Sequence, residues 1–390
     1  MKTLKTLALI CLGALLFVGC DPVDGGDNDD TKGLILRADK YEIYDNGGTD
    51  ANGIATFRLT FNGTPVTEGY TIYDENNNPI VGNTFSSTKI GYYEFWAEYG
   101  AAMTKVNIGI TVVATPPAAP EAPTDSDPSN LNFNRRVMMI QFTGTGCGYC
   151  PGMVTALHQL AEDTSVNNNY VLAAAHIGGY AGSDPALITE MGSKNIDKAF
   201  GIANYPNLIV DMVPNTVDVY PTAAFLKSMV NTALNRVKVK GGIAVNTEYH
   251  ADKKYVMVNA LVKAKETADF RIGAWLLEDG IEGVQTVYAD ANTVAGINYN
   301  IHNNCIRSMK CIQPENDFDF SGLTLGNIKA GETASHEFAF SLKNAWKAEN
   351  LHLIVFIATK EMSKDGKIKW YVNNAINAPI NGSVEFEYAK

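Results

Sequence analysis

The sequence predicts a multidomain protein in which one α/β domain is flanked by two all-β domains. Three observations lead to this fold class. An apolar strand-like run, a glycine-rich turn and a helix pattern follow one another at 137–161. Runs that alternate between apolar and polar residues fill the regions 32–114 and 240–390. A proline-rich stretch, 115–128, separates the first β region from the centre and predicts a semi-rigid, extended linker.

The length and charge of the chain limit its function. Its 390 residues are enough for two or three domains with hydrophobic cores. The formal net charge is -11, and no basic patch with interleaved aromatic residues occurs. Nucleic acid is therefore excluded as a partner.

The first residues predict an export signal. Lys2 and Lys5 precede the apolar stretch from Leu7 to Val18, which is too short for a mature membrane-spanning helix. With Gly19 before Cys20, residues 1–20 resemble a bacterial lipoprotein signal peptide, cleaved before a lipidated Cys20. An ordinary secretory signal cut elsewhere is the alternative. The resemblance implies a cell-envelope lipoprotein at the outer membrane, facing the periplasm or the surface, with its lipid anchor at Cys20.

The residues that follow predict a tether and a β domain. The acidic stretch 21–31 cannot bury itself and predicts a solvated tether. Residues 32–114 resemble the immunoglobulin-like β-sandwich domains that form stalks on bacterial surface proteins. The aromatic residues of this region, such as Tyr92 and Trp96, fit core and edge packing in strands better than a carbohydrate-binding site. We therefore expect a spacer or interaction module here.

The motif Cys147-Gly148-Tyr149-Cys150 lies where the central strand meets the helix. Unpaired N–H groups and the dipole at a helix N-terminus favour an anion, and a thiolate is the nucleophile of thiol–disulfide exchange. The motif therefore predicts a redox-active disulfide. The alternatives are a structural disulfide and half of a zinc site. Zinc would need a second pair, and Cys305 and Cys311 have the wrong spacing. No metal and no cofactor other than the Cys147–Cys150 disulfide are expected.

Residues 129–239 resemble the thioredoxin-like superfamily of thiol–disulfide oxidoreductases, on the strength of this motif and of Asn204-Tyr205-Pro206. The resemblance implies a cis peptide bond before Pro206, with Tyr149, Tyr205 and Pro206 beside the sulfurs to bind substrate. An ordinary trans proline in a turn is the alternative. The sequence departs from the family at Gln141, where an acid is usual, and at Gly146, where tryptophan is usual.

His176 ends the apolar strand pattern that begins at Tyr170, and the C-terminal ends of strands are where α/β sites form. Histidine at that place could exchange protons with the dithiol or bind substrate. A structural histidine that caps a turn is the other interpretation. Further along, a helical stretch is expected at Pro185–Phe200, a short strand at Thr216–Tyr220 and a helix at Thr222–Arg236.

Residues 240–390 predict a C-terminal β-sandwich-like domain, interrupted at 283–327 by a long stretch that is poor in pattern. Cys305 and Cys311 lie in that stretch. In an oxidising compartment they are candidates for a local structural disulfide. A relay to Cys147–Cys150 and two free thiols are the alternatives.

Taken together, the architecture resembles the Gram-negative outer-membrane lipoproteins related to a 28-kilodalton outer-membrane protein, which are described as adhesins or receptors. Two functions follow. The first is a membrane-anchored thiol–disulfide oxidoreductase, of reductase or isomerase type, that acts on extracytoplasmic protein thiols and disulfides with an unknown redox partner. Cys147 attacks and Cys150 resolves the mixed disulfide. The second is a surface adhesin or receptor that uses the same domain as a scaffold. A peroxidase fits less well.

Overall fold

The structure is a computed structural model, and it describes residues 32–178, 183–190, 192–214, 217, 220–314, 316, 318–363 and 366–389. The predicted signal peptide, Cys20 and the acidic tether lie outside the described residues. Within the ranges that the structure describes, no helix is both long and apolar enough to cross a membrane.

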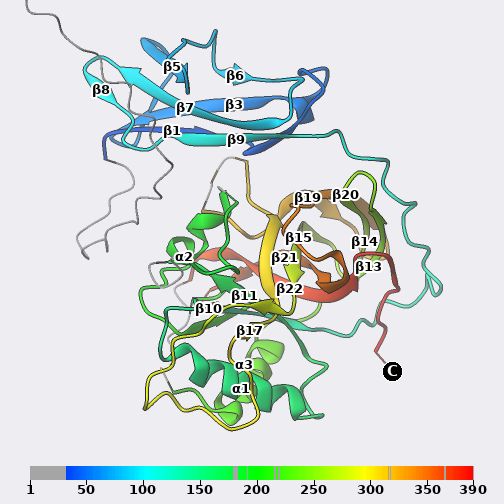
Figure 1. Cartoon of the computed structure of the whole chain (residues 1–390). Coiled ribbons are helices and arrows are strands. Elements are labelled where there is room, and N and C mark those ends of the chain that lie inside the picture. The colour runs from blue at the N-terminus through cyan, green and yellow to red at the C-terminus, as the bar shows by residue number, and fades with distance from the viewer. Residues whose placement is uncertain are drawn as a thin grey trace, which may run out of the picture.

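The N-terminal unit consists of two sheets packed face to face, drawn in blue and cyan at the top of Figure 1. One sheet contains β1 (Leu34–Ala38), β3 (Ala55–Phe61), β4 (Thr64–Val66) and β6 (Thr84–Phe85). The other contains β2 (Glu42–Tyr44), β5 (Tyr70–Asp74), β7 (Gly91–Tyr99), β8 (Ala102–Met103) and β9 (Ile108–Val113), and the short 3-10 helix η1 (Ala51–Gly53) follows β2. Alternate residues point inward, and Phe57 and Phe95 meet with ring centroids 4.8 Å apart.

The proline-rich linker lies along the C-terminal sheet in an extended conformation. Asn259 donates its side-chain amide to the carbonyl of Pro120 at 2.9 Å. The ammonium group of Lys263 is buried, and it binds the Asp125 carboxylate at 2.7 Å and the carbonyl of Pro128 at 2.7 Å. Because a buried charge needs partners, these contacts fix the course of the linker.

An eight-stranded sheet forms the centre of the molecule, in the order β12-β10-β11-β18-β15-β21-β22, with β19 also paired to β15. The strands are β10 (Val137–Thr143), β11 (Tyr170–His176), β12 (Asn207–Val210), β15 (Ala268–Glu278), β18 (Cys305–Lys310), β19 (Leu323–Ile328), β21 (Leu351–Met362) and β22 (Ile368–Pro379). β10 and β11 run parallel, as do β11 and β18, whereas β12 is antiparallel to β10. The sheet curls, so that the N–H of Val372 in β22 reaches the carbonyl of Asp211 after β12 at 3.4 Å.

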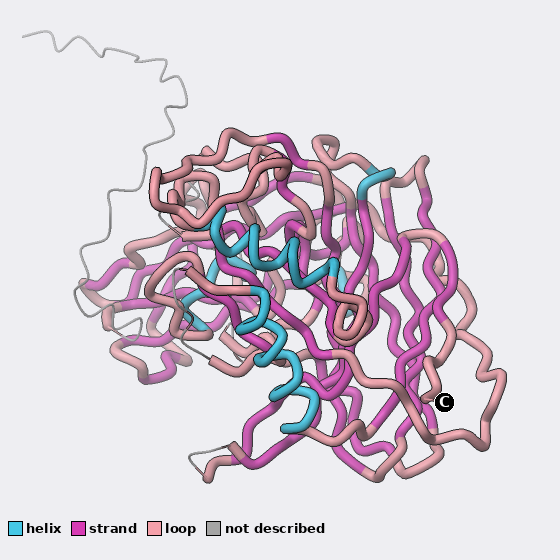
Figure 2. Tube along the Cα trace, turned by 90° about the horizontal axis from the view of Figure 1, so that it is seen from below, coloured by secondary structure: helices cyan, strands magenta, loops and turns pink. Residues whose placement is uncertain are grey.

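The two faces of the central sheet are covered differently. At the β10–β12 end, one face is covered by α1 (Cys150–Glu162) and α3 (Ala223–Arg236), which pack through Leu157, Leu160 and Leu226 (Figures 1 and 2). At the other end, β15 and β21 pack on a second sheet of β13 (Gly241–His250), β14 (Tyr255–Ala264), β20 (Thr333–Ser341) and β23 (Gly382–Val384). The opposite face of the central sheet encloses a core around Trp275 and Phe356, against which α2 (Ile196–Ala199) packs. The remaining short elements are β16 (Ile281–Glu282), β17 (Ile301–His302), η2 (Gly192–Asn195) and η3 (Ala348–Asn350).

The predicted fold class is wrong. The part of the chain that the structure describes is mostly β-structure, with 43% strand and 12% helix; its three α-helices are short, and it contains no thioredoxin-like α/β core. The sheet that contains β10 and β11 extends beyond residue 239, because β11 is followed in the sheet by β18, with Ala174 paired to Cys305. The core of β10 and β11 likewise includes Trp275 and Phe356 from the C-terminal half.

The strand that joins the two halves is hidden in the sequence because it is polar. β18 contains Arg307 and Ser308, which are buried and have hydrogen-bond partners: Arg307 binds Glu278 at 2.7 Å, and Ser308 donates to Glu190 at 2.8 Å. A pattern of apolar alternation cannot reveal such a strand. The helical stretch expected at Pro185–Phe200 is also shorter, because η2 and α2 are the only helical segments among its described residues. The strand expected at Thr216–Tyr220 lies mostly outside the described residues.

Candidate functional site

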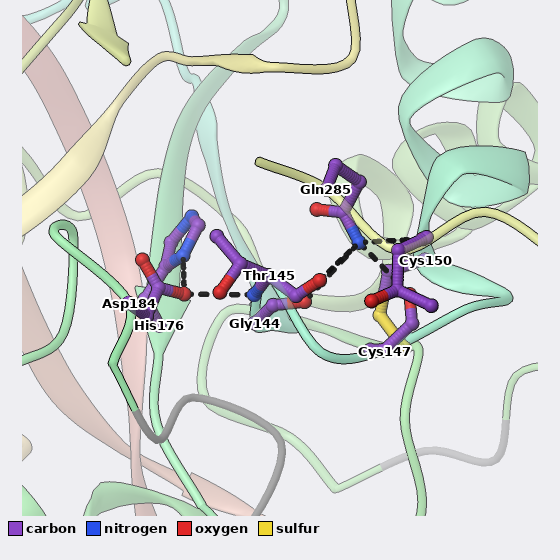
Figure 3. Close-up of a disulfide and its surroundings, with 8 residues drawn as sticks. Gly144, Thr145, Cys147, Cys150, His176, Asp184 and Gln285 are labelled. Atoms are coloured by element: carbon purple, nitrogen blue, oxygen red, sulfur yellow. Dashed lines mark hydrogen bonds and ion pairs between the residues drawn. A yellow bond between two sulfur atoms is a disulfide. The ribbon is translucent and has the colours of Figure 1, made fainter. Parts of the chain in front are cut away.

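Cys147 and Cys150 form a disulfide at the junction between β10 and α1, with a Cα–Cα distance of 5.4 Å (Figure 3). The turn is built by the backbone, since the N–H of Cys147 donates to the carbonyl of Gly144 at 3.0 Å and the N–H of Cys150 to that of Cys147 at 3.2 Å. α1 begins at Cys150, with Pro151 in its first turn. Cys147 therefore lies in the turn just before the helix, and its sulfur is joined to the first helical residue.

The register of the sheet brings the predicted site residues to one edge. Thr143 at the end of β10 pairs with His176 at the end of β11. On the other side of β10, Phe142 pairs with Asn207, so Pro206 lies where β10 ends. The Tyr205–Pro206 peptide bond is cis, as predicted, and Pro206 is buried. The turn to Cys147, the proline and the histidine thus share the same end of the sheet.

His176 is buried and bound to Asp184, a residue that the sequence did not single out. The Nδ1 atom of His176 lies 2.7 Å from Oδ2 of Asp184, and the same oxygen accepts the N–H of Thr145 at 2.8 Å (Figure 3). Burial opposes ionisation of Asp184, but the bonds from His176, Ala186 and Thr145 outweigh it and hold the pKa of Asp184 below its usual value. His176 therefore orients the turn through Asp184, and its ring does not reach the surface.

His302 adds a second imidazole to this network. Its ring makes an edge contact with His176, with centroids 4.9 Å apart, and its Nε2 lies 3.1 Å from the carbonyl of Gly283. Burial and the neighbouring His176 ring lower the pKa of His302. Because the neutral form of His302 is favoured and Nε2 faces a carbonyl, Nε2 carries the proton and donates a hydrogen bond to the carbonyl of Gly283.

A long loop covers the disulfide turn. Residues 283–300, which we call the strap, connect β16 to β17. The side-chain Nε2 of Gln285 lies within hydrogen-bond distance of three carbonyl oxygens of the turn, at 3.4 Å from Gly144, 3.1 Å from Thr145 and 2.9 Å from Cys147 (Figure 3). The backbone N–H of Tyr288 donates to the carbonyl of Gly148 at 3.0 Å. The strap is thus bonded along the whole turn.

Tyrosine side chains hold the strap at the start of α1. The ring of Tyr149 makes edge contacts with Tyr288 at 4.9 Å and with Tyr220 at 5.7 Å between centroids. Asp290 of the strap accepts a hydrogen bond from Tyr220 at 3.0 Å, which raises the pKa of Tyr220 to about 12. Tyr149 is therefore engaged with the strap, whereas Tyr205 donates to Asp197 of α2 at 3.2 Å.

The strap leaves little of the disulfide open to solvent. Cys147 is 3% exposed and Cys150 is 0% exposed. In β10, two positions before the strand ends, Gln141 is buried and its Nε2 has no hydrogen-bond partner. A neutral amide cannot take up the proton of a thiol. Exchange at Cys147 therefore requires the strap to move, without help from an acid at position 141.

The predicted disulfide between Cys305 and Cys311 is wrong. Both residues are free thiols, at the start of β18 and just after its end. An extended chain of six residues spans roughly 20 Å, far more than a disulfide allows. Burial raises the pKa of both thiols, and the Trp275 indole donates to the Cys311 sulfur at 3.1 Å. Both are unreactive in this environment.

Sequence reasoning missed Asp184, Gln285, Tyr288 and Asp290, and it did not assign His302 to this site. The only signal for the strap was the unusual length of the pattern-poor stretch 283–327, because its contacts with the turn join backbone groups, one amide and tyrosine rings that are distant in the sequence. In the part of the chain that the structure describes, no group of three or more histidine, cysteine or acidic side chains could hold a metal ion.

Comparison with known proteins places the chain in the cell envelope. The family model of outer membrane protein Omp28 matches residues 193–375, which is less than half of the chain and begins after the two bonded cysteines. The match supports the predicted relation to this family and confirms the predicted location in the cell envelope, at the outer membrane. No curated protein matches the chain. Among solved structures, HBP35 of Porphyromonas gingivalis is similar, with 15% identity and a TM-score of 0.49, covering 63% of this chain and 76% of that one.

Proposed function

We propose that this envelope protein is a membrane-anchored thiol–disulfide oxidoreductase that acts on extracytoplasmic protein disulfides through Cys147 and Cys150. The observation that carries the proposal is the bond between these two cysteines at the start of a helix, at the sheet edge that also holds Pro206 and His176. Two cysteines separated by two residues at a helix start are favourably placed for thiolate chemistry. No cofactor beyond this disulfide is needed.

The reaction is an exchange of two electrons and two protons. In the reduced protein, the Cys147 thiolate attacks one sulfur of a substrate disulfide, that S–S bond breaks, and the leaving substrate sulfur takes up a proton. The Cys150 thiolate then attacks the sulfur of Cys147, and the second substrate thiol leaves. The protein ends with its own disulfide, and the substrate is a dithiol. Run in reverse, the same steps oxidise a substrate.

The positions of the two cysteines support these roles. Cys147 lies in the turn outside the helix, so it is the cysteine that would meet the substrate once the strap has moved. Cys150 is fully buried in the first helical turn, where it can reach only Cys147. The positive end of the helix stabilises thiolate in both. We further propose that the protein works as a reductase or isomerase with an unknown redox partner, and that it carries its lipid anchor at Cys20.

A second function is supported by a different observation. Cys147 is buried under the strap, and the Omp28 match begins beyond both cysteines. A surface adhesin or receptor with an inert disulfide would have these features. In that case Cys147 and Cys150 stabilise the turn, and binding occurs elsewhere on the molecule.

Catalysis and trapping separate the two functions. We expect the purified protein, with dithiothreitol as electron source, to accelerate reduction of a model protein disulfide, and a Cys147→Ser variant to lose the acceleration. A Cys150→Ser variant should accumulate a mixed disulfide between Cys147 and substrate, seen as a larger band without reductant. If neither acceleration nor the mixed disulfide occurs, the disulfide is structural and the adhesin is the better account.

A further inference from the structure

The strap imitates a bound polypeptide on the disulfide turn. The N–H groups of Thr286 and Tyr288 donate to the carbonyls of Thr145 at 2.8 Å and Gly148 at 3.0 Å. Donation by alternate residues is how one edge of an extended chain pairs with a neighbour. The turn therefore presents carbonyl groups that an extended backbone can bind, and here the chain's own strap takes them.

The ring of Tyr288 covers the backbone of the disulfide turn at Gly148. A Cβ atom built on Gly148 would lie 2.5 Å from the Tyr288 ring carbons, so the ring packs directly on the glycine backbone. The ring also contacts Tyr149, yet 47% of Tyr288 remains exposed. Gly148 and Tyr149 thus form a platform for one flat or bulky apolar side chain, next to Cys147.

The strap is held by hydrogen bonds and ring contacts, but it buries little apolar surface. Between residues 284 and 300 only Ala291 is buried, whereas Val284, Val287 and Val294 are exposed. Segments with few buried apolar contacts open locally at low free energy. Its two ends stay together, because β16 pairs with β17 and the N–H of Gly283 donates to the carbonyl of Asn300 at 2.9 Å. The strap can therefore lift from the turn while its base and the central sheet remain folded.

We propose that the strap occupies the substrate-binding surface, and that the substrate is an extended polypeptide segment with an aromatic or large apolar residue near its disulfide. The substrate displaces the strap, takes over the carbonyls of Thr145 and Gly148, and places its apolar side chain where Tyr288 lies. Cys147 is covered until then. This inference rests on the exchange activity proposed above, and it adds the substrate class and the segment that covers Cys147.

The test weakens the strap without touching the cysteines. Gln285→Ala and Tyr288→Ala each remove a contact with the turn, and Val284→Ala is the matched control because Val284 is 87% exposed on the same strap. We expect dithiothreitol to reduce the Cys147–Cys150 disulfide about tenfold faster in the first two variants, and at the original rate in the control. Equal rates in all four proteins would overturn the inference.

Peptides test the substrate class in the Tyr288→Ala variant. A synthetic peptide with the sequence of residues 285–291 should slow the reduction by dithiothreitol again, and the same peptide with alanine at the position of Tyr288 should not. If both peptides or neither slow it, the aromatic preference is wrong. If strap and peptide behave as expected but no protein disulfide is exchanged, the covering role stands and the proposed oxidoreductase fails.

Discussion

Gly148 has no room for a side chain, and this constraint comes from the strap. The Tyr288 ring would lie 2.5 Å from a Cβ atom at Gly148, although the glycine does not have the positive backbone angle that glycine tolerates best. Packing against a segment 140 positions away therefore restricts Gly148, one of the two residues between the cysteines, to glycine. At Gln285, similarly, one amide contacts several carbonyls of the turn.

Gly148→Ala should loosen the strap while the rest of the molecule stays folded. The added methyl group forces the Tyr288 ring away, and overpacking of this kind costs about 1–3 kcal/mol. We expect faster amide hydrogen exchange at Thr286 and Tyr288, measured by mass spectrometry. Gly91→Ala is the control, since its Cβ would lie 3.5 Å from Tyr93, an ordinary contact. Unchanged exchange in Gly148→Ala would show that Tyr288 does not rest on the glycine.

His302 should make the stability of the protein sensitive to acid. The pKa of His302 is lowered in the folded state. As the pH falls, the unfolded chain therefore binds a proton at His302 before the folded chain does. The stabilisation is complete above the ordinary histidine pKa and is lost as the pH falls toward the lowered one. His302→Gln should therefore flatten the decline in unfolding free energy between about pH 7 and pH 5, as measured by urea denaturation.

The control for this pH dependence is His158→Gln, because the side chain of His158 is 54% exposed and only faces Glu162 on α1. Asp184, the charged neighbour of the imidazole pair, titrates below this range because its own pKa is lowered. The half-buried histidines His336 and His352, whose pKa values are also lowered, contribute equally to all three proteins. An unchanged slope in His302→Gln would mean that His302 does not resist protonation.

Among the structural elements, the sequence predicted individual strands and helices better than it predicted which strands pair in the central sheet. The strand at 137–142, the helix that follows Cys150 and the helix at 222–236 all have strong apolar periodicity, and β10, α1 and α3 form there. The cis bond before Pro206 was predicted from a family resemblance. β18 was not predicted, because its buried Arg307 and Ser308 look like surface residues until Glu278 and Glu190 are placed beside them.

Residues 129–239 should not fold alone, because they do not contain the strand β18. Without β18, the edge of β11 is unpaired, and without Trp275 and Phe356 the core beneath β10 is open to water. We expect a protein of residues 129–239 to show no cooperative urea unfolding by circular dichroism, whereas residues 129–389 unfold cooperatively. Cooperative unfolding of the shorter protein would restore the separate α/β domain that the structure contradicts.

The whole molecule is a β-rich assembly whose redox candidate is built from both halves of the chain. β10 and α1 provide the disulfide, β11 provides His176, and the strap arrives from beyond β16. The N-terminal sheets attach through a few polar contacts, such as Glu42 with Lys310 at 2.8 Å. Sequence patterns could predict neither the strap nor these contacts, since both depend on pairings between distant residues.

The central claim, that Cys147–Cys150 is redox-active, is tested most directly by its reduction potential. The purified protein is equilibrated in glutathione mixtures, with Cys147→Ser as control, and the fraction of disulfide is measured. We predict a potential between about -270 and -120 mV, the span of known dithiol catalysts. A pair that stays oxidised below about -300 mV would behave as a structural bridge and contradict the claim.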